Sequence, residues 1–293
     1  SLAEAATRAV AEGLGLTTID TAAGVHEVVN QNMAAAASMH GVEMGVDLRG
    51  VPLIAFGGAG PVHACGVADL LESDRVIFPV NASVLSAFGT LVSPVRIDLA
   101  RSLPRLIDSV DPGERDSLLE ELRSEGRRVL LAAGVPQDAV VFRYGVDARY
   151  AGQGNEITVW VGEGESWPAT ADDVTTAFVE EYQRIYGMAI PDVLIEVVTW
   201  RLAASASTSV VEPDTTLAAS TGQPVPSKSR AVVFGRGQDA VDTPVYQRSD
   251  LGAGAMFPGP AIVEERETTS VIRPGWTVEV ATDGSLIATR GTP

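Results

Sequence analysis

The stretch "PLIAFGGAGPVHACG", residues 52–66, decides the fold of this chain. An apolar run at residues 53–56 leads directly into Gly57-Gly58-Ala59-Gly60-Pro61, and a helix-like segment follows at once. Glycines add nothing to a core, but they allow positive φ angles or the close approach of another group to the backbone. A strand, a glycine turn and a helix N-terminus in this order are typical of an anion or nucleotide site. A tight strand–helix turn without a ligand needs glycine too, so both interpretations stay open.

The composition is that of a globular protein and excludes several kinds of partner. The 293 residues are 45% apolar and 20% charged; the length suffices for two domains and does not by itself exclude three. The formal net charge of −17 repels phosphate backbones and anionic lipids, so we expect no nucleic-acid and no membrane partner. The first residues lack the basic segment of a signal peptide, and Cys65 is the only cysteine, so we expect a cytoplasmic protein without an intrachain disulfide.

Common catalytic motifs are missing from the sequence. It contains no G-x-x-x-x-G-K-[ST], no G-x-S-x-G and no H-E-x-x-H. Catalytic residues are therefore left unassigned, and no metal site is predicted. The acidic group Glu264, Glu265 and Glu267 is expected to form a solvated turn.

Hydrophobic periodicity predicts alternating helices and strands, followed by a β-rich end. Helices are expected over 17–40, 61–72, 81–94, 115–134 and 171–187, and strands over 52–56, 75–79, 139–150, 155–161 and 193–204. Residues 205–229 are rich in Ser, Thr and Pro without periodicity, which predicts a linker or mobile loop. Six short β-type runs follow between residues 230 and 289.

Four spaced segments resemble a known family. They are "LIAFGGAGPVHA" (53–64), "NASVLSAFGTLVSP" (81–94), "DARYAGQGNEITVWV" (147–161) and "VYQRSDLGAGAMFPGPAIVEERETTSVIRPGW" (245–276). In this order they resemble the hydantoinase A/5-oxoprolinase/acetone carboxylase β-subunit family, and the resemblance covers essentially the whole chain.

The resemblance implies an α/β fold with an actin-like (ASKHA) ATPase architecture. Residues 1–100 are expected to be the closing part of the actin-like ATPase domain. An α+β segment is expected over 101–208 and a small β-rich C-terminal module over 209–293. The Asp-x-Gly-Gly-Thr phosphate loops of the family's N-terminal half do not occur in this sequence, so the chain resembles the C-terminal half of such a protein.

The function implied is the C-terminal portion of an ATP-dependent cyclic-amide hydrolase of the N-methylhydantoinase/5-oxoprolinase type. This portion would contribute part of the nucleotide cleft and would be inactive alone. The implied cofactors are ATP and Mg²⁺, bound mainly by the N-terminal half, and the implied partners are that half and a second large hydantoinase B-type subunit. Two alternatives remain: a portion of an acetone or acetophenone carboxylase-type subunit, or a non-catalytic scaffold module.

The resemblance implies nucleotide binding by Gly57, Gly58, Ala59 and Gly60. His63, three residues after Gly60, is a candidate for the cleft, with a packing or capping histidine as the alternative.

A second candidate for the cleft is Ser86, which belongs to the same segment as Asn81 and Ser83. The alternative is that Asn81 or Ser83 simply caps a helix. Asp147 and Arg149 are further candidates. Because they are two residues apart on an expected strand, they can instead form an ion pair that fixes the register of a hairpin.

Other polar positions are given structural or solvent roles. Many family members have Phe-x-x-x-His-x-x-x-Tyr-Gly where this chain has Phe178, Tyr182 and Tyr186-Gly187. Tyrosine has a pKa near ~10, so the proton-transfer role of that histidine is not expected here. His26 is expected to be structural. Asn32 can either reach the nucleotide or lie on a solvated helix face.

Overall fold

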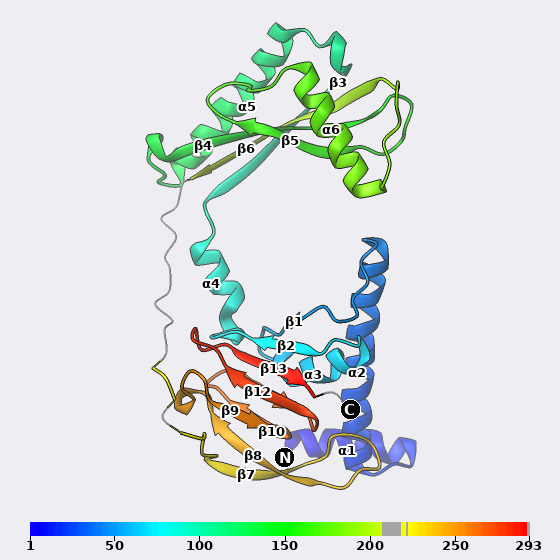
Figure 1. Ribbon diagram of the computed structural model, residues 1–293, viewed down its shortest axis with the longest axis vertical. Coiled ribbons are helices and arrows are strands. Elements are labelled where there is room, and N and C mark those ends of the chain that lie inside the picture. Colours follow the sequence, from blue (N-terminus) through cyan, green and yellow to red (C-terminus); the bar gives the residue numbers. More distant parts are fainter. Residues whose placement is uncertain (207–217, 221, 292–293) are drawn as a thin grey trace. The chain divides into compact units, whose positions relative to one another are not determined.

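A computed structural model describes residues 1–206, 218–220 and 222–291 of the chain (Figure 1). The chain forms two compact units, one made of residues 1–91 with 212–293 and the other of residues 92–211. A linker or mobile loop was expected over 205–229, and residues 207–217 and 221 of it lie outside the described residues. Among the helices described, none is both long enough and apolar enough to cross a membrane.

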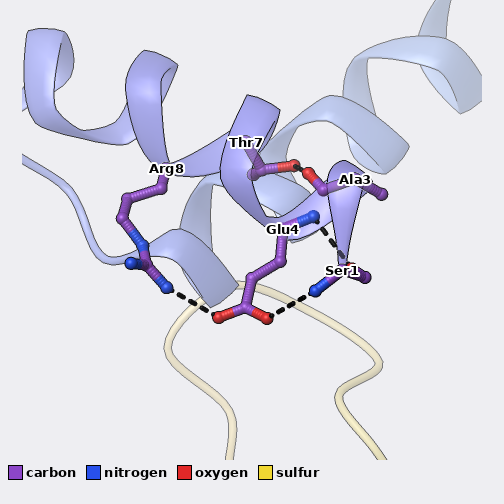
Figure 2. A network of polar contacts seen from close by, with 5 residues as sticks. All are labelled: Ser1, Ala3, Glu4, Thr7 and Arg8. Carbon is purple, nitrogen blue, oxygen red and sulfur yellow. Dashed lines mark hydrogen bonds and ion pairs between the residues drawn. The ribbon is translucent and has the colours of Figure 1, made fainter.

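Two helices open the first unit. The helix α1 (Leu2–Leu14) was not expected from the sequence, and it begins with a capping box in which Ser1 Oγ accepts from the Glu4 amide at 3.1 Å (Figure 2). Arg8 Nη2 donates to Glu4 one turn further along, at 2.8 Å. The helix α2 (Thr18–Glu43) confirms the helix expected over 17–40, and Thr17 caps it by accepting from the Asp20 amide.

The stretch 52–66, together with the strand that follows it, forms a parallel β–α–β unit. Its strands are β1 (Leu53–Ile54) and β2 (Arg75–Phe78), and they are joined by the helix α3 (Gly60–Leu70). The 3₁₀ turn Ala82–Val84 and the helix α4 (Leu85–Val92) follow β2.

Three strands from the end of the chain complete this sheet. Its order is β1-β2-β13-β12-β9, where β13 is Leu286–Arg290, β12 is Trp276–Val280 and β9 is Met256–Pro258 (Figure 1). β13 pairs antiparallel with β2 along its length. The expected division separated residues 1–100 from 209–293, whereas the structure joins the two ends of the chain in one sheet. Two short strands alone do not make a stable sheet, so β1 and β2 need the C-terminal strands.

A second sheet of the first unit has the order β11-β10-β8-β7. Its strands are Lys228–Val232 (β7), Val241–Gln247 (β8), Ala261–Glu264 (β10) and Thr269–Ile272 (β11), with the 3₁₀ turn Arg248–Asp250 after β8. The two sheets and α3 share one buried core, which includes Cys65, Phe78, Tyr246, Phe257 and Trp276.

The second unit is a four-stranded antiparallel sheet of order β3-β6-β4-β5. The strands are Arg96–Leu106 (β3), Val140–Tyr150 (β4), Ile157–Glu163 (β5) and Ile195–Ala206 (β6), and two short 3₁₀ turns follow β3 and precede β4. The helices α5 (Pro112–Ala132) and α6 (Ala171–Tyr186) contribute Leu122, Leu130, Val174 and Phe178 to the core of this sheet. β3 and β9 were not expected from the sequence.

Candidate functional site

The turn at residues 57–60, called the glycine turn, lies between β1 and α3. Gly57 has a φ of 87°, which favours glycine, and its amide donates to the carbonyl of Ala82 at 2.7 Å. On the other side, Thr268 Oγ1 donates to the carbonyl of Gly58 at 2.9 Å. The glycine turn is thus held by the turn that follows β2 and by the one between β10 and β11.

Gly58 and Gly60 are not required by the backbone or by packing. Neither has a positive φ. A Cβ placed on Gly58 would meet only the carbonyl oxygen of Glu267, at 4.0 Å, and one on Gly60 would meet no described atom within 4 Å. The space in front of both residues is therefore open.

The start of α3 has no side-chain cap, although Pro61 brings no N–H and the Val62 amide donates to the Ala59 carbonyl at 3.0 Å. Its N-cap residue is Ala59, which makes no side-chain capping bond, and no acidic residue lies in the first turn. The N-terminus of a helix carries partial positive charge on its free N–H groups. The glycine turn therefore ends in an uncapped helix N-terminus, which attracts anions.

A polar cavity of about 650 Å³ is lined by the two turns that hold the glycine turn and by the 3₁₀ turn after β8. The lining residues are 81, 83 and 84, 247–249 and 264–267. Asn81 has a φ of 57°, and neither Asn81 nor Ser83 caps the following helical turn with its side chain. Asn81 is nevertheless the N-cap residue of this turn, as the alternative expected, but its side chain makes no capping bond.

The acidic turn at the edge of this cavity is only partly solvated, which corrects the expectation for its glutamates. Glu264 accepts from Lys228 and from Gln247, each at 2.9 Å. Glu265 is largely buried opposite Arg248, with 3.8 Å between Oε1 and Nη1. Burial raises the pKa of Glu265 and lowers the pKa of Arg248. Both carboxylates are thus already paired with cations.

His63 lies in the first turn of α3 and forms part of a histidine–asparagine cluster. Its Nδ1 lies 2.8 Å from Oδ1 of Asn30, and the Asn30 Nδ2 lies 3.3 Å from Nδ1 of His26. The two imidazoles stack with 4.7 Å between ring centroids. Burial, followed by the neighbouring His26, lowers the pKa of His63. Both histidines are therefore packed residues, and His63 also lies next to the glycine turn.

Asn30 is the residue that the sequence did not single out. It is only 3% exposed, whereas Asn32, for which a nucleotide contact and a solvated face were both left open, is exposed. His26 and Asn30 are four residues apart on α2, so they share one helix face. That spacing was the available signal, but it does not reveal the partner His63.

Ser86 lies at the start of α4 and is exposed. Its carbonyl accepts from Thr90 Oγ1 at 3.0 Å within the helix. The contact between this segment and the glycine turn is made by Ala82 rather than by Ser86.

Asp147 and Arg149 lie on β4 in the second unit, and they do not pair with each other. Asp147 accepts from Arg201 and from Thr158, both at 2.6 Å, and Arg149 pairs with Glu196 at 2.8 Å. The predicted Asp147–Arg149 ion pair is therefore wrong. Neighbours on adjacent strands come closer than residues two apart on one strand, and they take both charges.

Tyr182, which stands where many family members have histidine, lies on α6. Its ring packs against Tyr150, Phe178 and Tyr186, and its hydroxyl accepts from Gln153 Nε2 at 3.2 Å. This residue is part of an aromatic cluster in the second unit.

Two family models match the chain. One, described as Hydantoinase/oxoprolinase, matches residues 1–99, and the other, the Hydantoinase/oxoprolinase C-terminal domain, matches residues 114–286.

Named relatives agree with this match. The caprolactamase subunit alpha of Pseudomonas jessenii is 28% identical over 96% of this chain and 41% of its own length. A crystal structure of that ATP-dependent caprolactamase superposes with a TM-score of 0.74 at 27% identity, covering 99% of this chain and 43% of the other. A nucleotide-free acetone carboxylase structure shares the fold, with a TM-score of 0.75 at 24% identity over 98% of this chain and 42% of the other. The chain spans between about a fifth and two-fifths of the length of the curated relatives it matches.

Proposed function

Because the chain belongs to the hydantoinase/oxoprolinase family, we propose that it is the C-terminal portion of an ATP-dependent enzyme that acts on the carbonyl group of a cyclic amide. In this proposal the glycine turn forms one wall of the nucleotide cleft. The relatives named as ATP-dependent support the use of ATP.

The observation that carries the proposal is the open space in front of Gly58 and Gly60. Within the described residues, these two glycines are explained neither by a positive φ nor by a close neighbour. A side chain at either position would instead project into the space outside the chain. We infer that the nucleotide approaches the backbone there, next to the uncapped start of α3.

The residues present fit a phosphate-bearing ligand better than a metal ion. The α3 N-terminus carries the positive end of the helix dipole and has no acid in its first turn, whereas Glu264 is bonded to Lys228 and Glu265 faces Arg248 at 3.8 Å. Mg²⁺ would therefore be held mainly by the part of the protein outside this chain. Bound ATP would supply a phosphoryl group that activates the carbonyl oxygen of the substrate, so that water attacks a better electrophile.

In this chemistry the residues of the chain would bind and orient the nucleotide. The glycine turn and the first turn of α3 would position the nucleotide, and burial, which lowers the pKa of His63, favours the neutral form of the imidazole beside them. Neither nucleophile nor general base is assigned to this chain.

The same proposal makes the first unit the closing part of an actin-like ATPase domain, packed against the N-terminal half. Exposed apolar side chains on α2 support such a contact. Met39 and Val42 are 67% and 80% exposed, and Val25, Val28 and Met33 are exposed as well. A groove of about 420 Å³ between α1 and α2 is also mostly apolar. The relative named as a subunit supports a larger complex, with a second large hydantoinase B-type subunit as the proposed partner.

Substrate-dependent ATP turnover tests this proposal and separates it from its alternatives. The chain is joined to the N-terminal half and combined with the second subunit, and ATP hydrolysis is measured with a hydantoin, 5-oxoproline or a lactam. We expect turnover with a cyclic amide and none from the chain alone. Turnover only with a ketone plus bicarbonate would instead show a carboxylase, and no turnover with either class would favour a scaffold module.

A further inference from the structure

A second, smaller cavity lies on the first unit and is not part of the proposed nucleotide cleft. It measures about 180 Å³, which is below the ~300–1,000 Å³ of pockets for drug-sized ligands. We call it the α2–α3 pocket. Its lining residues are Ala23 and His26 of α2, Val62 of α3, residues 232–234 at the end of β7, and Val271 and Arg273 at the end of β11.

The walls of this pocket are apolar, and its polar groups are an imidazole and a guanidinium. The apolar walls are formed by Val62, Val271 and residues 232–234 together with Ala23. Polar ligand atoms thus have only His26 and Arg273 as side-chain partners among the lining residues. No acidic side chain lines it, although the chain as a whole is strongly acidic.

The buried amide of Asn30 fixes which proton His26 presents. In its assigned orientation the Asn30 oxygen faces His63 Nδ1, so His63 donates, and the Asn30 amide nitrogen donates to His26 Nδ1. An imidazole that accepts at Nδ1 carries its proton on Nε2. His26 therefore offers an Nε2–H donor.

Arg273 is held in place but not saturated. Its Nε lies 3.4 Å from Asp69, and its Nη2 lies 3.5 Å from the Phe234 carbonyl. Asp69 is shared with Arg290, at 3.5 Å, and accepts from Trp276. In the part of the chain that the structure describes, no hydrogen bond is made by Nη1 of Arg273, so this donor remains for a ligand.

Gly66 lets the Asn30 amide and the Arg273 guanidinium lie close to α3. A Cβ at this position would lie 2.4 Å from Asn30 Nδ2 and 3.1 Å from Arg273 Nη1. The absence of a side chain thus lets the amide that orients His26 and the guanidinium of Arg273 approach the same point on α3.

We propose that the α2–α3 pocket binds a small monocarboxylate with a short apolar chain. The carboxylate accepts from His26 Nε2–H and from the guanidinium of Arg273, and the apolar chain packs against the valine and phenylalanine walls. Both polar groups are donors, so the pocket selects an acceptor, and charge-assisted bonds from arginine favour a carboxylate over a neutral oxygen. This binding does not require nucleotide.

The proposal is tested by titrating the chain with butyrate and pentanoate, using butanol and butylamine as comparators, by calorimetry or by the NMR signals of the His26 ring. We expect a Kd of about 1 mM or tighter for a carboxylate and at least about tenfold weaker binding of the alcohol and the amine. Arg273→Gln should weaken carboxylate binding by about tenfold or more, whereas Arg230→Gln, on exposed β7, should leave it unchanged.

A second pair of variants tests the pocket independently, in case Arg273→Gln fails to fold. Ala23→Leu fills the pocket from α2 and should abolish binding, whereas Ala22→Leu, next to it on the exposed face, should not. No binding by any carboxylate, equal binding of the alcohol, or unchanged binding in Ala23→Leu would each overturn the proposal. Mg-ADP titrations of the same samples measure nucleotide binding independently, so that failure of the carboxylate proposal can be distinguished from failure of the proposed nucleotide cleft.

Discussion

Gly58 and Gly60 of the first unit and Gly126 and Gly145 of the second unit have opposite surroundings. In the second unit, a Cβ on Gly145 would lie 2.7 Å from the Val159 carbonyl oxygen, and one on Gly126 would lie 2.9 Å from Ala204 Cβ. These glycines let a strand and a helix pack closely. In the first unit, Gly58 and Gly60 face open space. The sequence shows glycine in each case, and the surroundings exclude a packing role for Gly58 and Gly60. Their place directly before the α3 N-terminus, which the equally open Gly154 lacks, is what favours a ligand.

The largest effect on stability is expected at Gly145. Its Cβ would also meet the Trp160 ring at 2.8 Å, at the point where the register of β4 against β5 shifts. Gly145→Ala should lower the free energy of unfolding by about 2 kcal/mol, because overpacking forces neighbours to move. Urea unfolding measures this, with Gly154→Ala as the control, since a Cβ at Gly154 meets no described atom within 4 Å. Equal stability of the two variants would contradict the contrast.

The next largest effect is the coupling between Asp147 and Arg201 in the second unit. A double-mutant cycle on Asp147 and Arg201 should give a coupling energy of about 1 kcal/mol, because the two side chains are in contact and Asp147 is buried. The cycle on Asp147 and Arg149 should give a coupling near zero. A larger coupling for the second pair would restore the ion pair expected from the sequence.

At the glycine turn the sign of the stability change should reverse. Gly60 is the first residue of α3 and its φ is compatible with alanine. Gly60→Ala should therefore raise the free energy of unfolding by about 0.5 kcal/mol, while it weakens nucleotide binding. Denaturant unfolding and Mg-ADP titration of one sample check both signs, and destabilisation by this change would show that Gly60 is a packing glycine after all.

The smallest expected effect concerns pH and His63. Burial and the neighbouring His26 place the pKa of His63 below the 6.5 of an exposed imidazole. The unfolded chain then takes up this proton at a higher pH than the folded chain does. The contribution of His63 to stability is thus full above about pH 6.5 and is lost as the pH falls below it.

Unfolding curves at pH 7.5 and pH 5.5 measure this contribution. His63→Gln should lose less stability than the wild-type chain on going to the lower pH. An identical loss in both proteins would mean that His63 titrates normally in the folded state.

The sequence predicted the elements of the fold well where patterns are local. The helix over 17–40 and the β–α–β unit around the glycine turn follow from periodicity and turn residues, and the structure confirms them. The pairing of β13 with β2 joins segments some two hundred residues apart, and no local pattern carries that information. For this reason the expected boundary at residue 209 separated strands that share a sheet.

For the candidate site, too, local motifs were predicted from the sequence and contacts between distant segments were not. The glycine turn was visible as a motif, and the family it indicated is confirmed. The partners of Asp147, the burial of Glu265 and the bridging role of Asn30 depend on contacts between distant segments. Residue type and spacing predict which groups can pair, but the tertiary contacts decide which of them do.

The measurement that tests the central claim most directly is a calorimetric titration with Mg-ADP of the chain joined to the N-terminal half, beside Gly58→Val and the control Gly13→Ala. A Cβ at Gly58 would meet only the Glu267 carbonyl oxygen, at 4.0 Å, among the described atoms, so we expect this variant to remain folded. We expect at least about tenfold weaker binding in Gly58→Val and unchanged binding in Gly13→Ala. Equal affinity of the wild-type protein and a folded Gly58→Val variant would contradict the placement of the nucleotide on the glycine turn.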